Sequence, residues 1–242
     1  MIAFILTAGL GTRLKPLTDH CPKALVPYQG KPLLAHLLER MQAFGIRHFV
    51  LNLHHFADQL QAYAADYAKE HGLQIDFSDE RALLLDTGGA LTHALPLFDG
   101  EERILIHNVD IFSDLDLNAF VRDAERLNAD ALLSVRQRQT SRFLYADADG
   151  RLRAWKNLKS GETKGAAIQS NFKALAFSGI HVLKTSLIRQ WTAQYGSNTP
   201  FSVIDAYLNA IPFADIRLLE QQGGFWKDMG KMEDFNLPLF TV

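Results

Sequence analysis

The stretch FILTAGLGTRLKPLTDHCPKALVP, residues 4–27, determines how the rest of the chain is interpreted. An apolar run with β-branched and aromatic members ends at Thr7, and small residues follow it: Ala8, Gly9 and Gly11. This pattern predicts a buried strand that ends in a loop. Glycines after a strand leave backbone N–H groups uncovered by a Cβ, which suits an anionic ligand such as a phosphate.

Two cationic side chains, Arg13 and Lys23, follow this loop and strengthen its interpretation as a triphosphate cradle. Two better-known glycine motifs do not fit. A dinucleotide-binding fingerprint needs a third glycine where this chain has Leu14, and a P-loop ends in Gly-Lys-Ser/Thr.

The pattern that fits is G-x-G-T-R, nine residues and then Lys23, with Pro22 before the lysine and Pro27 after it. It resembles the signature of the sugar-1-phosphate nucleotidyltransferases. The resemblance implies an α/β fold, the nucleotide-diphospho-sugar transferase fold, in which helices flank a Rossmann-like, mainly parallel sheet. It also implies transfer of a nucleotidyl group from a nucleoside triphosphate to a sugar 1-phosphate, with Mg²⁺ as cofactor.

Two acidic residues far apart in the sequence, Asp110 and Asp228, are expected to hold this Mg²⁺. Each follows a predicted strand, 103–108 and 225–227, and open α/β sheets bind ligands at the carboxyl ends of their strands. Magnesium takes one or two carboxylates and completes its shell with phosphate oxygens and water. The segments H-N-V-D-I-F and W-K-D-M-G-K resemble the metal-binding segments of the family, whereas either acid alone could cap a turn.

The same resemblance implies roles for further residues. Arg13 would hold the leaving β and γ phosphates, and Lys23 would bridge the α-phosphate and the incoming phosphate. The nucleotide would lie against Ala8, Gly9, Gly11, Thr12, Glu80, Thr87 and Gly88. The sugar phosphate would lie against Asn108, Gly179 and Lys231. Gly88 and Gly179 have a structural alternative, which is tight packing or a β-bulge.

The composition is that of one α/β domain spanning residues 1–242, of which 48% are hydrophobic. A net charge of −2 does not support nucleic-acid binding. The single cysteine, Cys21, cannot form an internal disulfide, so a reducing cytoplasm is expected. The apolar start of the chain is too short to cross a membrane. We expect small-molecule substrates, no nucleic acid or membrane partner, and a monomer or dimer.

Strand and helix patterns alternate along the chain, which predicts a mainly parallel sheet with helices on both faces. Helices are expected at 32–44, 56–71, 88–95, 116–127, 186–195 and 202–208. Strands are expected at 2–6, 47–53, 73–77, 103–108, 131–135, 174–183, 216–219 and 225–227, with a D-A-D-G hairpin turn at 147–150. The polar segment 156–171 is predicted to be a mobile loop near the substrate.

Within the family, the chain is most similar to a short branch typified by N-acetylmuramate-1-phosphate uridylyltransferases. Mannose-1-phosphate guanylyltransferases share many of the same strings and remain an alternative. The chain departs from the family at Val109, where relatives usually have glycine. An alternative of another class is a regulatory paralogue that binds nucleotide sugar without making it, but such a protein would not need the intact metal pair.

Two other metal motifs are weaker. Residues 114–116, Asp-Leu-Asp, resemble the D-x-D of metal-dependent glycosyltransferases, but they lie past the strand end and favour a helix start. His54–His55 and His20–Cys21 lack the rest of a zinc ligand set.

Overall fold

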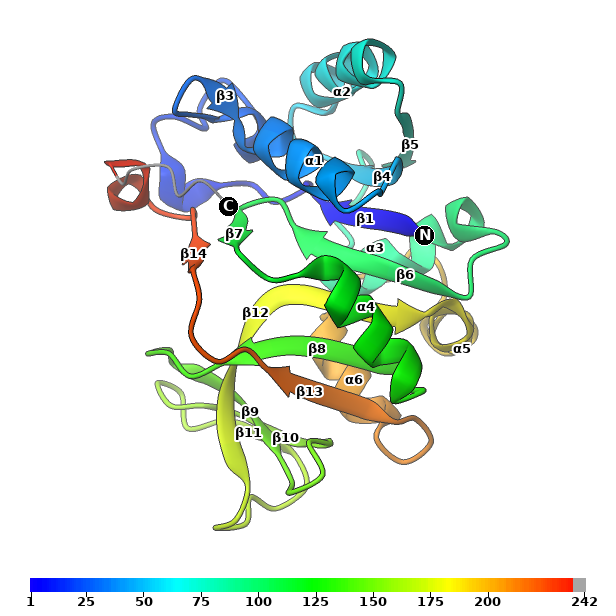
Figure 1. Ribbon diagram of the computed structural model, residues 1–242, viewed down its shortest axis with the longest axis vertical. Coiled ribbons are helices and arrows are strands. Elements are labelled where there is room, and N and C mark those ends of the chain that lie inside the picture. Colours follow the sequence, from blue (N-terminus) through cyan, green and yellow to red (C-terminus); the bar gives the residue numbers. More distant parts are fainter. Residues whose placement is uncertain (237–242) are drawn as a thin grey trace.

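The computed structural model describes residues 1–236 and shows a twisted sheet with helices on both faces (Figure 1). The predicted α/β fold is confirmed. The end of the predicted domain, residues 237–242, lies outside the described residues.

The main sheet has the strand order β11-β10-β9-β12-β6-β1-β4-β5, and β8 pairs with both β12 and β13. Its strands are β1 (Ile2–Leu6), β4 (His48–Leu53), β5 (Gln74–Asp79), β6 (Arg103–Asn108), β8 (Ala131–Arg136), β9 (Arg142–Ala146), β10 (Leu152–Asn157), β11 (Thr163–Gly165), β12 (Lys173–Lys184) and β13 (Ile216–Glu220). The four strands β5, β4, β1 and β6 run parallel, as do β8 and β13. Strand β12 lies antiparallel to its neighbours β6, β8 and β9.

Within residues 1–236, six α-helices cover the two faces of the sheet (Figure 1). One face packs against α1 (Leu33–Ala43), α2 (Ala57–His71) and α4 (Leu117–Arg126). The other face packs against α3 (Asp86–Ala94), α5 (Thr185–Tyr195) and α6 (Val203–Ala210). The short elements are η1 (Thr12–Leu14), η2 (Lys23–Leu25), β2 (Pro27–Tyr28), β3 (Lys31–Pro32), η3 (Leu95–Phe98), β7 (Ile111–Ser113), β14 (Trp226–Asp228) and η4 (Met232–Asn236).

The central strands are apolar throughout because both of their faces are covered. Successive side chains in a strand point to opposite faces. Phe4 and Ile106 therefore lie in the core beneath α3, α5 and α6, while Ile5 and Leu105 lie in the core beneath α1, α2 and α4. A continuous hydrophobic run in the sequence is the expected mark of such a strand.

Strand β12 is interrupted at Gly179, where a β-bulge was the structural alternative to a role in sugar binding. Its pairing with β8 shifts register between Phe177 and His181, and Gly179 there has a φ of +78°. A β-bulge of this kind bends a strand. The first part of β12 pairs with β9 and the last part with β6.

The prediction for residues 156–171 needs correction, because part of this segment is a strand. β11 pairs antiparallel with β10, and Lys164 lies opposite Trp155. The Lys164 ammonium also lies 2.8 Å from Asp205 of α6. These contacts join the segment to the sheet and to a helix, and neither contact is visible in local sequence patterns.

Strand β1 lies at the centre of the parallel part of the sheet. The chain passes from β1 to β4 and β5 on one side and then returns to β6 on the other side. Ligands of open α/β sheets bind at such a reversal, outside the carboxyl ends of the strands. Among residues 1–236, no helix combines the length and the apolar character needed to span a bilayer.

Two histidines of the sheet, His107 and His181, are buried to 1% exposure. Burial lowers the pKa of His107 to about 4 and the pKa of His181 to about 3. The unfolded chain, with histidine pKa values near 6.5, therefore binds more protons than the folded protein between these values. The free energy of unfolding falls as the pH falls through this window.

We predict that each buried histidine removes about 1.4 kcal/mol of stability per pH unit between pH 6 and pH 4.5. His181→Gln should flatten this dependence, because the variant lacks one of the two groups. Urea unfolding across the pH range measures it, with exposed His20→Gln as the control. An equal slope in His181→Gln and the wild type would show that this buried histidine does not contribute.

Candidate active site

A cavity of about 460 Å³ lies at the carboxyl ends of β1 and β6. Thr7, Ala8 and Gly9, in the loop after β1, form one wall of this cavity together with Lys23. The end of β6 contributes Asn108, Val109 and Asp110. The backbone N–H of Val109 donates to the Leu6 carbonyl at 3.3 Å. The sequence therefore placed these segments at the correct edge of the sheet.

The start of the loop after β1 is fixed by Asn52 of β4. Its amide oxygen accepts hydrogen bonds from the backbone N–H groups of Thr7 (2.7 Å) and Ala8 (3.2 Å). Its amide nitrogen donates to Glu80 at 2.9 Å, and the Glu80 carboxylate also accepts the N–H of Leu85 at 3.2 Å. Two strand ends are thereby tied to the loop that faces the cavity.

The two glycines of the loop differ in what surrounds them. A Cβ built on Gly9 meets no atom within 4 Å, so this position is open toward the cavity. Gly11 has a φ of +63°, and a Cβ there would lie 2.8 Å from Thr18. Gly11 is therefore required by the backbone and its packing, whereas Gly9 leaves space that a ligand can enter.

Lys23 and Asp110 form an ion pair within this site. Both side chains are largely buried, with 12% exposed. An ion pair removed from water is screened less than a surface pair. Lys23 therefore places a positive charge beside the carboxylate that ends β6.

Asp228 lies beside Asp110 because β14 pairs with β7, where Asp228 is opposite Ile111. The backbone N–H of Met229 also donates to the Asp110 carbonyl at 2.8 Å. Arg13 approaches Asp228 at 3.9 Å. A Cβ on Gly230 would lie 2.5 Å from the Arg13 guanidinium, so glycine is what permits this approach.

The Asp228 carboxylate has a raised pKa. Burial is the largest cause and repulsion from Asp110 the second, while Lys23 and Arg13 act in the opposite direction. Like charges held close together destabilise the ionised form of each other. The site thus holds two neighbouring acids, each with a cation beside it, and burial together with repulsion from Asp110 still disfavours the ionised form of Asp228.

The residues present fit a magnesium ion. One oxygen of Asp228, Oδ1, is buried and has no hydrogen-bond partner in the described structure. No group of three or more His, Cys, Asp or Glu able to hold a metal occurs among residues 1–236. Two carboxylates are sufficient for Mg²⁺ when phosphate and water supply its other ligands.

The residues expected at the sugar phosphate are only partly assembled. A Cβ on Gly179 would lie 3.1 Å from the Asn108 side chain, so these two positions are in contact. Lys231 lies on the other side of Asp228, in a larger cavity, and pairs with Glu233 at 3.0 Å.

Some residues expected to contact the nucleotide have other partners in the structure. A Cβ on Gly88 would lie 2.3 Å from the Phe201 ring, and the Gly88 N–H donates to the Phe201 carbonyl at 2.8 Å. Glu80 is 2% exposed and does not line the 460 Å³ cavity. Thr87 lines the cavity and Thr12 is exposed in η1. Gly88 therefore serves packing and Glu80 serves the Asn52 network, while their contact with a nucleotide stays a prediction.

Comparison with known proteins identifies the family. A family model described as nucleotidyl transferase matches residues 2–237. The chain belongs to the nucleotidyl transferase family. The predicted resemblance to sugar-1-phosphate nucleotidyltransferases is confirmed.

Two relatives and one solved structure of similar fold show the extent of the similarity. The chain is 35% identical to an N-acetylmuramate alpha-1-phosphate uridylyltransferase of Caulobacter vibrioides over 84% of this chain and 81% of that protein. It is 26% identical to a mannose-1-phosphate guanylyltransferase catalytic subunit beta of Dictyostelium discoideum, over 97% of this chain and 62% of that protein. A putative glucose-1-phosphate thymidylyltransferase of Bacillus anthracis superimposes with a TM-score of 0.79 at 14% identity, covering 100% of this chain and 98% of that one.

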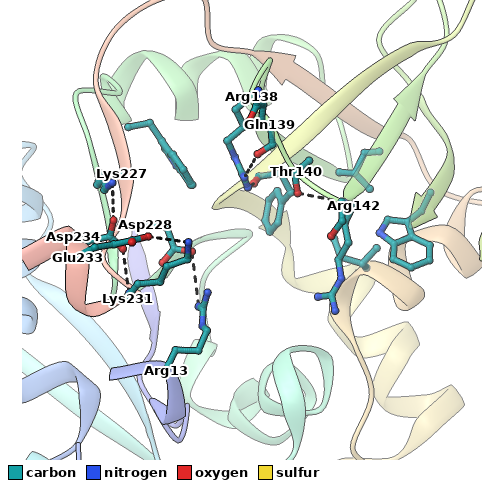
Figure 2. A pocket seen from close by; sticks show the side chains of 16 residues that line it. Arg13, Arg138, Gln139, Thr140, Arg142, Lys227, Asp228, Lys231, Glu233 and Asp234 are labelled. Atoms are coloured by element: carbon teal, nitrogen blue, oxygen red, sulfur yellow. Dashed lines mark hydrogen bonds and ion pairs between the residues drawn. The ribbon is translucent and has the colours of Figure 1, made fainter. Parts of the chain in front are cut away.

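The nucleotidyltransferase has a second, larger cavity of about 1050 Å³ beside Asp228 (Figure 2). Arg138 and Arg142 line it, and the sequence analysis missed both of them. They belong to the polar segment 136–142, which runs from the last residue of β8 to the first residue of β9 and carries three arginines. A cationic segment after a strand was the available signal, but only the fold shows that this segment shares a cavity with Asp228.

The weaker metal motifs have structural explanations. Asp116 caps α4 by accepting the N–H of Ala119 at 2.9 Å, and Asp114 accepts the N–H of Phe225 at 2.7 Å. His54 is hydrogen-bonded to the Glu80 carbonyl at 2.8 Å. These contacts agree with the sequence-based preference for structural roles.

We predict that alanine at Gly9 affects triphosphate binding, whereas alanine at Gly88 affects the stability of the fold. Gly9→Ala should leave the melting temperature nearly unchanged, because its Cβ enters open space, yet weaken triphosphate binding by excluding the ligand. Gly88→Ala should cost about 1–3 kcal/mol of stability through overpacking against Phe201.

Thermal unfolding together with calorimetric titration of nucleoside triphosphate measures both effects. Unchanged triphosphate affinity in Gly9→Ala would show that the ligand does not approach this backbone position.

Proposed function

We propose that the protein transfers a uridylyl group from UTP to N-acetylmuramate 1-phosphate, giving the nucleotide sugar and pyrophosphate, with Mg²⁺ as cofactor. The observation that best supports this proposal is a cluster of two acids and two cations at the carboxyl edge of the sheet: Asp110, Asp228, Lys23 and Arg13. The 35% identity to an N-acetylmuramate alpha-1-phosphate uridylyltransferase supports this substrate pair. The alternative substrate pair is GTP with mannose 1-phosphate. It is supported by a lower identity of 26% to a mannose-1-phosphate guanylyltransferase subunit.

The reaction needs charge neutralisation more than proton transfer. A phosphate oxygen of the sugar 1-phosphate attacks the α-phosphorus of the triphosphate, and the bond to the oxygen that bridges to the β-phosphorus breaks. The nucleophile has a second pKa near 6 and is already ionised at neutral pH. No general base is therefore required, and the obstacle is repulsion between two highly charged anions.

The residues of the cluster suit this requirement. Lys23 lies between the loop after β1 and the acid pair, where its ammonium can neutralise the α-phosphate and the incoming phosphate. Arg13 is 59% exposed at its side chain and can reach the departing phosphates. Mg²⁺ bound by Asp110 and Asp228 would add charge neutralisation and fix phosphate oxygens.

A cytoplasmic location and a role as a catalyst follow from the same proposal. The substrates are nucleoside triphosphates and phosphorylated sugars, and Cys21 is a free cysteine, which fits a reducing compartment. A regulatory protein that only binds nucleotide sugar would not release pyrophosphate.

The decisive experiment is a matrix of common nucleoside triphosphates against several sugar 1-phosphates, read as pyrophosphate. The highest kcat/KM is expected for UTP with N-acetylmuramate 1-phosphate, and activity should disappear with a chelator. A preference for GTP with mannose 1-phosphate would overturn the substrate assignment. Nucleotide-sugar binding without any pyrophosphate release would favour the regulatory alternative.

Two variants test the assigned roles. Lys23→Ala and Asp228→Asn should each lower kcat about 10²- to 10³-fold, as loss of a group that stabilises transition-state charge does. The exposed residues Lys159 and Asp66 supply the matched controls Lys159→Ala and Asp66→Asn. Normal turnover in the two site variants would contradict the roles given to Lys23 and Asp228.

A further inference from the structure

The 1050 Å³ cavity extends away from the acid pair toward the hairpin of β9 and β10. Arg13, Asp228 and Lys231 lie at one end of it (Figure 2). Arg142 lies at the opposite end, and Arg138 lies on the wall between (Figure 2). A sugar whose phosphate lies near Asp228 would therefore direct its body toward the two arginines.

The charges at the two ends are balanced differently. At the near end each acid has a cation: Asp228 with Arg13, Glu233 with Lys231, and Asp234 with Lys227. Arg138 and Arg142 form no ion pair with any acid of residues 1–236. The far part of the cavity is consequently positive, which favours an anionic group on the ligand.

Arg138 is held in place by the protein. Its guanidinium donates to the Phe177 carbonyl at 3.0 Å and lies 4.4 Å from the ring centre of Trp226. This stacking is a cation–π arrangement. The side chain thus contributes a fixed positive charge to the wall of the cavity.

Arg142 is exposed, and its side chain extends into the cavity (Figure 2). Its own backbone N–H donates to Thr140 at 3.2 Å, which fixes the turn before β9. Apolar groups lie on the same wall: Leu144, Trp155 and Ile204. A planar guanidinium beside apolar side chains matches a carboxylate on a short alkyl group, because arginine binds carboxylates through two parallel hydrogen bonds.

We propose that Arg142, with Arg138 behind it, binds a carboxylate carried by the sugar, so that the enzyme selects acidic sugar 1-phosphates over neutral ones. N-Acetylmuramate has such a group, a lactyl ether whose methyl-bearing carbon carries a carboxylate. The inference rests on the proposed function, because it takes the larger cavity to be the sugar site. A neutral hexose offers no partner to either arginine.

The test compares N-acetylmuramate 1-phosphate with its lactyl primary amide, which is similar in size but uncharged. The wild type should prefer the acid by roughly 10- to 100-fold in kcat/KM, the effect of a hydrogen-bonded charge pair. Arg142→Gln should bring the ratio of acid to amide close to one, mainly through KM for the acid. Arg122→Gln removes an exposed arginine of α4 and should keep the wild-type ratio.

Calorimetric binding of the acid and the amide gives a second readout that does not need turnover. Equal loss of affinity for both compounds in Arg142→Gln, or no preference for the acid in the wild type, would overturn the inference. Absence of pyrophosphate release by the wild type with every substrate pair would instead overturn the proposed function. Loss of the preference for the acid therefore contradicts only the role of Arg142, whereas absence of pyrophosphate release contradicts the proposed function.

Discussion

Two carboxylates that repel each other are held side by side at the carboxyl edge of the sheet. Asp110 lies two residues after the end of β6. The pairing of β14 with β7 brings Asp228 next to it. Lys23 pairs with the first acid and Arg13 approaches the second, yet the pKa of Asp228 remains raised, chiefly by burial and then by Asp110. An arrangement of this kind is costly unless a ligand brings further positive charge. Binding of a divalent cation together with a polyphosphate, as proposed above, would supply that charge.

The fold supplies this arrangement through its strand order. Strand β1 lies where the chain reverses direction across the sheet, so the loop after it opens at the ligand-binding edge. Asn52 fixes the start of that loop, and Gly9 leaves it open. The chain then returns near its end to place β14 beside β7, with Gly230 admitting the Arg13 guanidinium. The glycine loop, the two cations and the two acids thus meet although the sequence separates them widely.

Local patterns predicted much of this architecture because periodicity and glycine position are local properties. Strand 103–108 has the predicted bounds, and Asp116 caps its helix as expected. The prediction of a loop at 156–171 was wrong in part, because β11 forms through its pairing with β10. The contacts of Gly88 with Phe201 and the place of Arg142 in the larger cavity depend on partners distant in sequence. A single sequence shows neither of them.

The most direct measurement of the central claim is a crystal structure with Mn²⁺ in place of Mg²⁺, a non-hydrolysable triphosphate analogue and a sugar 1-phosphate. Anomalous scattering locates the metal without reference to the surrounding residues. One strong metal peak is expected within bonding distance of oxygens of both Asp110 and Asp228 and of the α-phosphate. A metal bound elsewhere, or bound by phosphates without either carboxylate, would contradict it.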